Sequence, residues 1–270
     1  MLCFAIALRG PKSTDNWPGV LADFRRTLHS VFNQTNPDFR VYVGCSGIPE
    51  LDESYDDRLR WVTADLPVPK TWEEKCRDRS WKLCLCAQQI RKDLPELAVR
   101  GGGTFVFPVD ADDLVSCRLA EYAAAHPEAN GFKSPTGYRW IRGSSRLEIT
   151  PYYGGTMNIM KLYEEDLPET LPDPSLCFDE ATAMALTARW PIRWYDCEVE
   201  GKFAALGRPL TPLPFRSTIY VLGTGENISD EDPHAQGEQD RFHPVAFLRS
   251  LNPFTHRRLS DTIKREFGMV

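Results

Sequence analysis

Apolar positions recur with two different periods along the first half of the chain. Between Pro18 and Asn33 they fall three or four residues apart, which predicts a helix that packs one stripe against a sheet. Short apolar runs before and after this helix predict strands, and the alternation of strands with helices favours a largely parallel sheet. The predicted strands are residues 3–8, 39–43, 60–64 and 104–109, and the predicted helices are residues 18–33 and 73–91.

The pattern changes beyond residue 116. Two extended arms around Gly-Ser-Ser predict a hairpin over residues 139–149, and the polar, acidic stretch 223–242 has no periodicity and predicts a loop. The tail, residues 255–267, has the basic and apolar positions of a short amphipathic helix. Further helices are expected at about 116–125 and 178–190, and further strands at 156–161, 192–195 and 218–222.

Composition predicts a folded, enzyme-sized body. The 270 residues are 42% hydrophobic, and the formal net charge of −6 gives no support for nucleic-acid binding. No apolar run approaches the roughly 20 residues needed to cross a bilayer. The eight cysteines show no zinc spacing, and the first apolar run lacks the basic flank and cleavage site of an export signal. We therefore expect a cytoplasmic protein with reduced thiols.

Three carboxylates crowd the end of a predicted buried strand, in the stretch FVFPVDADDLVS. Asp110, Asp112 and Asp113 lie within four residues, and like charges oppose one another unless water or a cation lies between them. The cluster is therefore either a solvated loop or a cation site. A plainer alternative is that Asp112 or Asp113 caps the helix expected to follow. The triple glycine at 101–103 precedes this strand rather than following one, so it does not match a dinucleotide-binding Rossmann loop.

A strand that ends in apolar-Asp-Ala-Asp-Asp after strand-helix-strand units resembles the GT-A glycosyltransferases, in particular those of family 2. The segment TLHSVFNQTNPDFRVYVG resembles that family's helix, Gln-Thr turn and second strand. The resemblance covers roughly residues 3–200 and is nearest to bacterial capsule and lipopolysaccharide transferases, including rhamnosyltransferase-like proteins.

This resemblance implies an α/β fold of the GT-A type. A mostly parallel, Rossmann-like central sheet would be flanked by helices, with a smaller mixed sheet on the acceptor side and a C-terminal extension. The glycosyltransferase domain would span 1–205, with its nucleotide-sugar half at 1–115 and its acceptor half at 116–205. Residues 206–270 would form the extension, packed on the same domain.

The resemblance also assigns a divalent metal to the acids. A diphosphate leaving group gains negative charge as the glycosidic bond breaks, and Mn²⁺ or Mg²⁺ held by one or two carboxylates offsets that charge. Asp112 would be the direct ligand, Asp110 would face the ribose and the metal shell, and Asp113 would be directed at the donor or acceptor sugar. His234 and His243 could add a ligand, although a surface loop histidine is the commoner case.

An inverting transfer needs a base that takes the proton of the acceptor hydroxyl. Family 2 enzymes carry a Glu-Asp pair at the start of the corresponding helix, where this chain has the reversed order, Asp179 and Glu180. Asp179 is our first choice and Glu180 the second. A plain helix N-cap at Asp179 is the alternative.

The expected nucleotide contacts depart from the family pattern. The second strand of the family usually ends in Asp-Asp-Gly-Ser, whereas this chain reads Gly-Cys-Ser-Gly at 44–47. The available substitutes are Arg9, Arg77 and Lys82 for the diphosphate, and Asp78 for the base. A solvated helix face with local ion pairs is the alternative interpretation of these helical residues.

Together with these residues, the resemblance implies a metal-dependent, inverting transferase in bacterial surface polysaccharide synthesis. It would move a sugar from a nucleotide-sugar donor to a carbohydrate or lipid-linked glycan acceptor. The loop 223–242 could close over the donor, and the basic tail could contact the inner face of a membrane.

Two alternatives stay open. A nucleotidyltransferase acting on a sugar phosphate would use a similar sheet, although the segment after the first strand, Leu-Arg-Gly-Pro, lacks its glycine-rich phosphate loop. A catalytically silent GT-A-like binding module would keep the fold without the activity.

Overall fold

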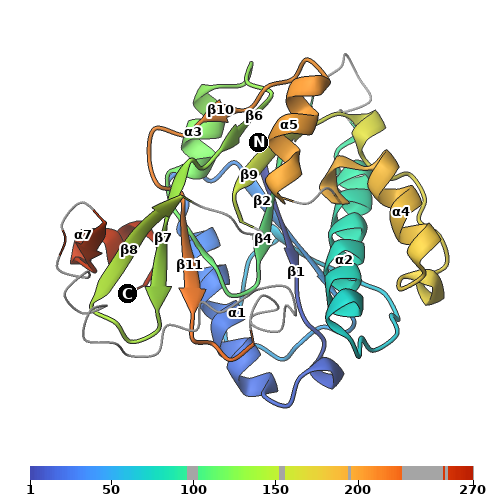
Figure 1. Cartoon of the computed structure of the whole chain (residues 1–270), viewed down its shortest axis with the longest axis horizontal. Helices are drawn as coiled ribbons and strands as arrows, with labels where there is room; N and C mark the ends of the chain where they lie inside the picture. Colours follow the sequence, from blue (N-terminus) through green and yellow to red (C-terminus); the bar gives the residue numbers. More distant parts are fainter. Residues whose placement is uncertain (96–102, 152–155, 194–195, 227–251, 253–254, 270) are drawn as a thin grey trace.

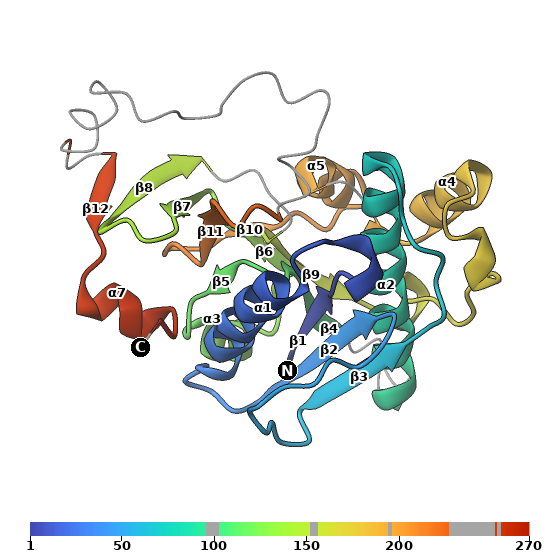
Figure 2. The same cartoon turned by 90° about the horizontal axis from the view of Figure 1, so that it is seen from below.

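The computed structural model describes the whole chain except residues 96–102, 152–155, 194–195, 227–251, 253–254 and 270. Within the described residues the chain forms an α/β body with two sheets (Figures 1 and 2). The larger sheet has the strand order β10 (Thr211–Pro212), β6 (Gly131–Lys133), β9 (Asn158–Leu162), β4 (Thr104–Asp110), β1 (Leu2–Ala7), β2 (Phe39–Cys45) and β3 (Leu59–Thr63). Its pairs are parallel except where β9 meets β4 and β6, which confirms the predicted mostly parallel sheet.

Helices flank this sheet and divide its core in two. The α-helices are α1 (Trp17–Phe32), α2 (Trp72–Asp93), α3 (Leu119–Ala125), α4 (Glu180–Arg189), α5 (Asp196–Ala205) and α7 (Asp261–Glu266). Short 3-10 turns are η1 (Pro11–Ser13), η3 (Glu164–Asp166), η4 (Pro174–Leu176) and η5 (Pro191–Arg193). Side chains of the central strand β1 alternate between the cores, because successive residues of a strand face opposite sides. Phe4 and Ile6 pack with α1 and α3, whereas Cys3 and Ala5 pack with α2.

The two long helices begin at residues that satisfy their first backbone N–H groups. Asn16 caps α1 by accepting from the Gly19 N–H at 3.1 Å, and Thr71 and Glu74 form a capping box at the start of α2. The buried stripe of α1 contains Val20 and Phe24, which confirms the helix predicted from periodicity.

Helix α2 lies unusually close to β2. A Cβ atom on Gly44 would lie 2.5 Å from the carbonyl oxygen of Lys82, so only glycine allows this approach. The contact fixes the middle of α2 against the carboxyl end of β2. It thereby brings Asp78 and Lys82 to the edge of the sheet where ligands bind in open α/β folds.

The smaller sheet is mixed and has the order β12 (His256–Arg258), β8 (Arg146–Pro151), β7 (Thr136–Ile141), β11 (Thr218–Leu222) and β5 (Leu114–Val115). β7 and β8 pair in antiparallel fashion, which confirms the predicted hairpin. The chain passes from β4 to β5 through the acidic turn 110–113, so the acids lie where the two sheets meet. Residues 206–270 supply β10 to the larger sheet and β11 and β12 to the smaller one.

Two predictions of secondary structure are wrong. The strand expected at 192–195 is absent from the described residues there, because Pro191–Arg193 forms a 3-10 turn that leads to the unpredicted helix α5. The tail is helical only in α7, because His256–Arg258 instead pairs with β8 as an edge strand. Most of the loop predicted at 223–242 lies outside the described residues.

The cysteines described by the structure, Cys3, Cys45, Cys76, Cys84, Cys86, Cys117 and Cys177, are all free. Burial raises the pKa of the Cys3 and Cys177 thiols to about 12, so neither is a reactive thiolate at neutral pH. No helix in the described part of the chain combines the length and apolar character needed to cross a membrane.

Candidate functional site

A cleft of about 520 Å³ lies at the carboxyl ends of β1, β2 and β3. It is lined by the loops that follow these strands, at 10–13, 46–50 and 65–69, and by the start of α1. In open α/β sheets this edge is where ligands bind, because loops from neighbouring strands converge there. The sequence analysis did not identify the loop residues of this cleft.

The walls of the cleft combine apolar and polar side chains. Trp17, Leu21, Ile48 and Val68 contribute to them, and Ile48 keeps 60% of its surface exposed. Large exposed apolar side chains around a concave site are typical of a surface that covers a flat, apolar ligand face. Such a cleft suits a planar heterocycle better than a bare sugar.

The base of the cleft carries a buried ion pair. Lys82 Nζ donates to Oδ2 of Asp78 at 2.6 Å, and the two residues are 1% and 6% exposed. Burial raises the pKa of Asp78, and the ammonium of Lys82 opposes that shift. Oδ1 of Asp78 has no hydrogen-bond partner among the described residues. These two residues therefore do not lie on a solvated helix face, and Asp78 presents an acceptor beside the cleft.

Two arginines of α2 make contacts outside the cleft. Arg77 donates from Nη1 to the carbonyl oxygen of Phe178 at 2.7 Å, which ties α2 to the segment before α4. Arg79 donates from Nε to Oδ1 of Asp110 at 2.6 Å. Arg79 was not predicted from the sequence, and it partly neutralises one of the three acids.

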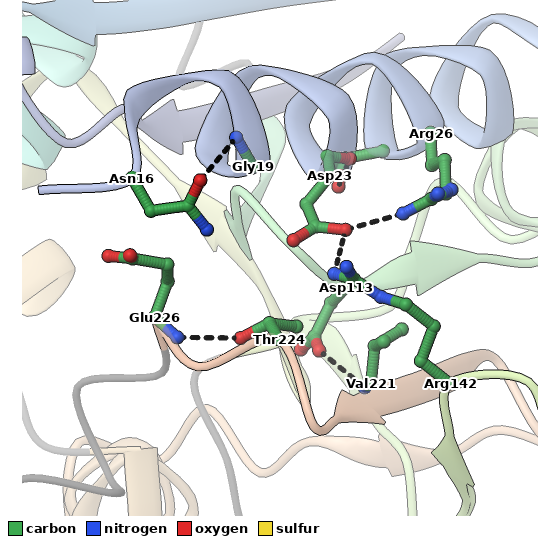
Figure 3. A network of polar contacts seen from close by, with 10 residues as sticks. Asn16, Gly19, Asp23, Arg26, Asp113, Arg142, Val221, Thr224 and Glu226 are labelled. Atoms are coloured by element: carbon green, nitrogen blue, oxygen red, sulfur yellow. Dashed lines mark hydrogen bonds and ion pairs between the residues drawn. The ribbon is translucent and has the colours of Figure 1, made fainter. Parts of the chain in front are cut away.

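The acidic turn holds its three carboxylates in different surroundings. Asp110 ends β4, and its N–H donates to Oγ1 of Thr156 at 2.9 Å. Asp112 is partly buried; burial, followed by repulsion from Asp110 and Asp23, raises its pKa to about 7. Asp113 is fully buried, and its Oδ1 accepts from the Val221 N–H at 3.3 Å (Figure 3).

These positions decide between two of the predicted alternatives. Helix α3 begins at Leu119, after the strand β5, so neither Asp112 nor Asp113 caps a helix. The capping hypothesis for these residues is wrong. Asp113 binds β11 from within the core, whereas Asp110 and Asp112 remain at the edge of the sheet.

Asp23 adds an acid that the sequence analysis missed. It projects from α1 toward the acidic turn, is 4% exposed, and its Oδ1 contacts both Arg26 and Arg142 (Figure 3). An aspartate within the buried stripe of an amphipathic helix was a signal available in the sequence, because charges on such a face are rarely buried without a partner.

Arg9 directly precedes the cleft loop 10–13. Burial is the main cause that raises the pKa of Asp112 and of Asp78, and the positive charge of Arg9 opposes both shifts. Its Nη1 donates to Oε2 of Glu226 at 2.6 Å. The contact with Glu226 was not predicted, because Glu226 and Arg9 are 217 residues apart in the chain.

The candidate bases lie at the start of α4. Asp179 caps this helix, with Oδ1 accepting from the Thr182 N–H at 2.7 Å, and hydrogen bonds from Thr182 lower its pKa. Glu180 is the first helical residue, and both side chains are exposed. In both views α2 lies between β4 and α4 (Figures 1 and 2). Arg77 contacts the carbonyl of Phe178, directly before Asp179, and its charge contributes to the lowered pKa of Asp179.

The residues present fit a cation site with few protein ligands. No three metal-binding side chains among those described converge closely enough to enclose an ion. Mg²⁺ and Mn²⁺ bound with a nucleotide take only one or two carboxylates from the protein. The crowding of negative charge around Asp112 provides the environment for such a site. His234 and His243 lie outside the described residues.

No family model and no curated protein matches the chain. Among solved structures, the chain is similar to the 1–349 portion of S. aureus TarS, with 14% identity and a TM-score of 0.39. That match covers 82% of this chain and 60% of the TarS chain. It is also similar to 2-C-methyl-D-erythritol 4-phosphate cytidylyltransferase (IspD) of Francisella tularensis, with 14% identity and a TM-score of 0.39, over 78% of this chain and 89% of that one. Likenesses at this level establish neither a family nor an activity for the chain.

Proposed function

We propose that the protein is a metal-dependent glycosyltransferase that moves a sugar from a nucleotide-sugar donor to a carbohydrate acceptor. The observation that carries the proposal is that the cleft, Arg9 and the acidic turn all follow the carboxyl ends of the neighbouring strands β1, β2, β3 and β4. A base in the cleft, a diphosphate at Arg9 and a sugar at the acidic turn would follow the order of groups in a nucleotide sugar.

The cleft would hold the nucleoside. Its apolar side chains suit the faces of a base, and Oδ1 of Asp78 can accept a hydrogen bond from a ring or exocyclic N–H. Asp78 would thus replace the aspartate that the family carries at the end of the second strand. Lys82 donates to the other oxygen of Asp78 and is too buried to serve the diphosphate directly.

Arg9 would bind the diphosphate, since guanidinium groups form strong charge-assisted hydrogen bonds to phosphate oxygens. Asp112 would be the principal metal ligand, with Asp110 as the second candidate. When bound, the divalent cation would offset the charge that develops on the departing diphosphate. Arg79 would orient Asp110 through its 2.6 Å contact, and Asp113 would hold the acidic turn onto β11.

Asp179 or Glu180 would accept the proton of the acceptor hydroxyl, and the attack would invert the anomeric carbon. The cap at Asp179 stabilises its carboxylate and makes it a weaker base, which favours Glu180. Arg77 would position this segment relative to α2.

The acceptor would be a carbohydrate, free or linked to a lipid in a bacterial surface polysaccharide pathway. Arg257 and Arg258 are exposed on the edge strand β12, and Lys264 follows on α7. These cations could attract the protein to an anionic membrane that carries a lipid-linked acceptor.

A thermal-shift screen with UDP-, GDP-, CMP- and dTDP-sugars, with and without Mn²⁺, tests the proposal. A ligand that binds the native state raises the melting temperature, and we expect one nucleotide class to do so most strongly with the metal. Product analysis then separates the alternatives. Sugar transfer or donor hydrolysis releases a nucleoside diphosphate, or CMP where the donor is a CMP-sugar. A nucleotidyltransferase releases pyrophosphate from a nucleoside triphosphate, and a silent module releases none of these. Absence of any nucleotide-dependent shift would contradict the proposal.

A further inference from the structure

Glu226 meets Arg9 at the edge of the proposed donor site. Nη1 of Arg9 donates to Oε2 of Glu226 at 2.6 Å, and Oγ1 of Thr14 donates to the same oxygen at 2.8 Å. The side chains of Arg9 and Glu226 are 13% and 14% exposed. One carboxylate oxygen of Glu226 therefore accepts hydrogen bonds from two donors in the loop that follows β1, the charged Arg9 and the neutral Thr14.

The turn after β11 is folded in a way that places Glu226 there. Gly223 and Gly225 both adopt φ of 75°, a left-handed conformation that glycine accepts without strain. Thr224 is buried between them, and its Oγ1 accepts from the Glu226 N–H at 3.0 Å (Figure 3). The position of the carboxylate follows from this local structure and not only from its attraction to Arg9.

Arg9 is also the cation that a diphosphate would meet between the cleft and the acidic turn. A carboxylate oxygen and a phosphate oxygen are equivalent acceptors for a guanidinium and a hydroxyl. Two anions that share these donors would repel each other strongly in a partly buried site. The Glu226 carboxylate and a bound phosphate therefore compete for the same position.

We propose that Glu226 is an internal competitor of the ligand, whose carboxylate occupies the phosphate position at Arg9 and Thr14 until an anionic ligand displaces it. The inference rests on the proposed function only in assuming that a diphosphate binds at Arg9. Competition of this kind lowers the apparent affinity by the fraction of molecules in which the site is open. Anions that contact only Arg9 and Thr14 would then bind too weakly to displace Glu226. Ligands that also contact the cleft would gain enough binding free energy to displace it.

Calorimetric titration with inorganic pyrophosphate in chelator-treated buffer tests this competition, because the probe has no base or sugar. We expect Glu226→Gln and Glu226→Ala to bind it roughly 3- to 10-fold more tightly than the wild type, as expected for removal of one partly buried competing charge. Arg9→Gln should bind it more weakly. The double variant Arg9→Gln with Glu226→Gln should gain nothing over Arg9→Gln, since Glu226 acts through Arg9. Two different substitutions at Glu226 guard against a folding defect in either.

Asp15→Asn provides the matched control. Asp15 follows Thr14 in the loop after β1, is exposed and does not line the cleft, so its substitution removes one carboxylate charge without touching the Arg9 contact. We expect it to change the affinity by less than about twofold, because exposed charges are screened by solvent and salt. If the wild type binds pyrophosphate through Arg9 while both Glu226 variants bind it equally well or more weakly, the competition is overturned and the donor site stands. If neither pyrophosphate nor any nucleotide sugar binds any variant, the competition and the proposed function both fail.

Discussion

Arg79 on α2 is paired with Asp110 at the end of β4, with 2.6 Å between Nε and Oδ1. The two side chains are 24% and 26% exposed, so solvent screens the pair only in part. The contact joins the helix that lines the proposed nucleotide cleft to the turn that carries the proposed metal ligands. Binding events at the two places are therefore expected to influence each other.

Arg79→Gln tests this link. Removal of the guanidinium leaves Asp110 without its cation, so we expect Mn²⁺ to bind roughly 3- to 10-fold more tightly by calorimetry. The cost in stability should stay at about 1 kcal/mol or less, as for other partly exposed pairs. Arg77→Gln is the matched control, because Arg77 contacts the Phe178 carbonyl and no acid of the turn. Equal effects of the two substitutions on Mn²⁺ affinity would refute a specific role for Arg79.

The buried pair at the base of the cleft gives a separate prediction. Asp78→Asn should lower nucleotide affinity and also destabilise the fold by about 3 to 5 kcal/mol, because the Lys82 ammonium is left buried without its partner. Combining Asp78→Asn with Lys82→Met should restore much of the stability but not the nucleotide affinity. Chemical denaturation and nucleotide titration of the wild type and the two variants check this. Full recovery of nucleotide binding in the double variant would show that Asp78 has only a structural role.

Local periodicity was sufficient to predict the parallel half of the fold. The stripe of α1 and the apolar runs of β1, β2 and β4 are each fixed by neighbours within a few residues, and their predicted positions agree with the structure within about two residues. The acidic turn was also predictable from local sequence. Charged residues directly after a buried strand must lie at the edge of its sheet.

Contacts that depend on distant pairing were not predictable. His256–Arg258 has the composition of a helix but pairs with β8, and Arg9 meets a glutamate from the far end of the chain. Asp113 was predicted to face the donor or acceptor sugar. It instead accepts a hydrogen bond from the Val221 N–H, because the chain enters the second sheet at β5. Hydrogen bonding and burial across the whole fold outweighed local preference at these places.

The raised pKa of Asp112 predicts how stability depends on pH in metal-free protein. The folded carboxyl titrates at about 7 instead of its ordinary 3.8, so the folded state binds more protons between these values. The free energy of unfolding should therefore fall as pH rises from about 4 to about 7. With chelator present, Asp112→Asn should remove about 2 to 4 kcal/mol of this dependence, as urea titrations at several pH values can show. A pH dependence identical to that of the wild type would contradict the crowding of charge at Asp112.

The two candidate bases are distinguishable by matched amide substitutions. Asp179→Asn and Glu180→Gln each remove a carboxylate while keeping its shape, so loss of the base should lower kcat by about 100-fold or more with little change in donor affinity. Asp179→Asn should also cost about 1 kcal/mol at the start of α4, where Asp179 accepts from Thr182. We expect the larger loss of kcat at Glu180. Unchanged kcat in both variants would exclude this segment as the source of the base.

The most direct test is calorimetric titration of wild type and Asp112→Asn with the nucleotide sugar that gives the largest thermal shift, with and without Mn²⁺. We expect the wild type to bind the donor at least about 10-fold more tightly when Mn²⁺ is present, and Asp112→Asn to lose that gain while keeping its metal-free affinity. Equal donor affinity with and without Mn²⁺ in the wild type, or an undiminished gain in Asp112→Asn, would contradict a metal site at the acidic turn.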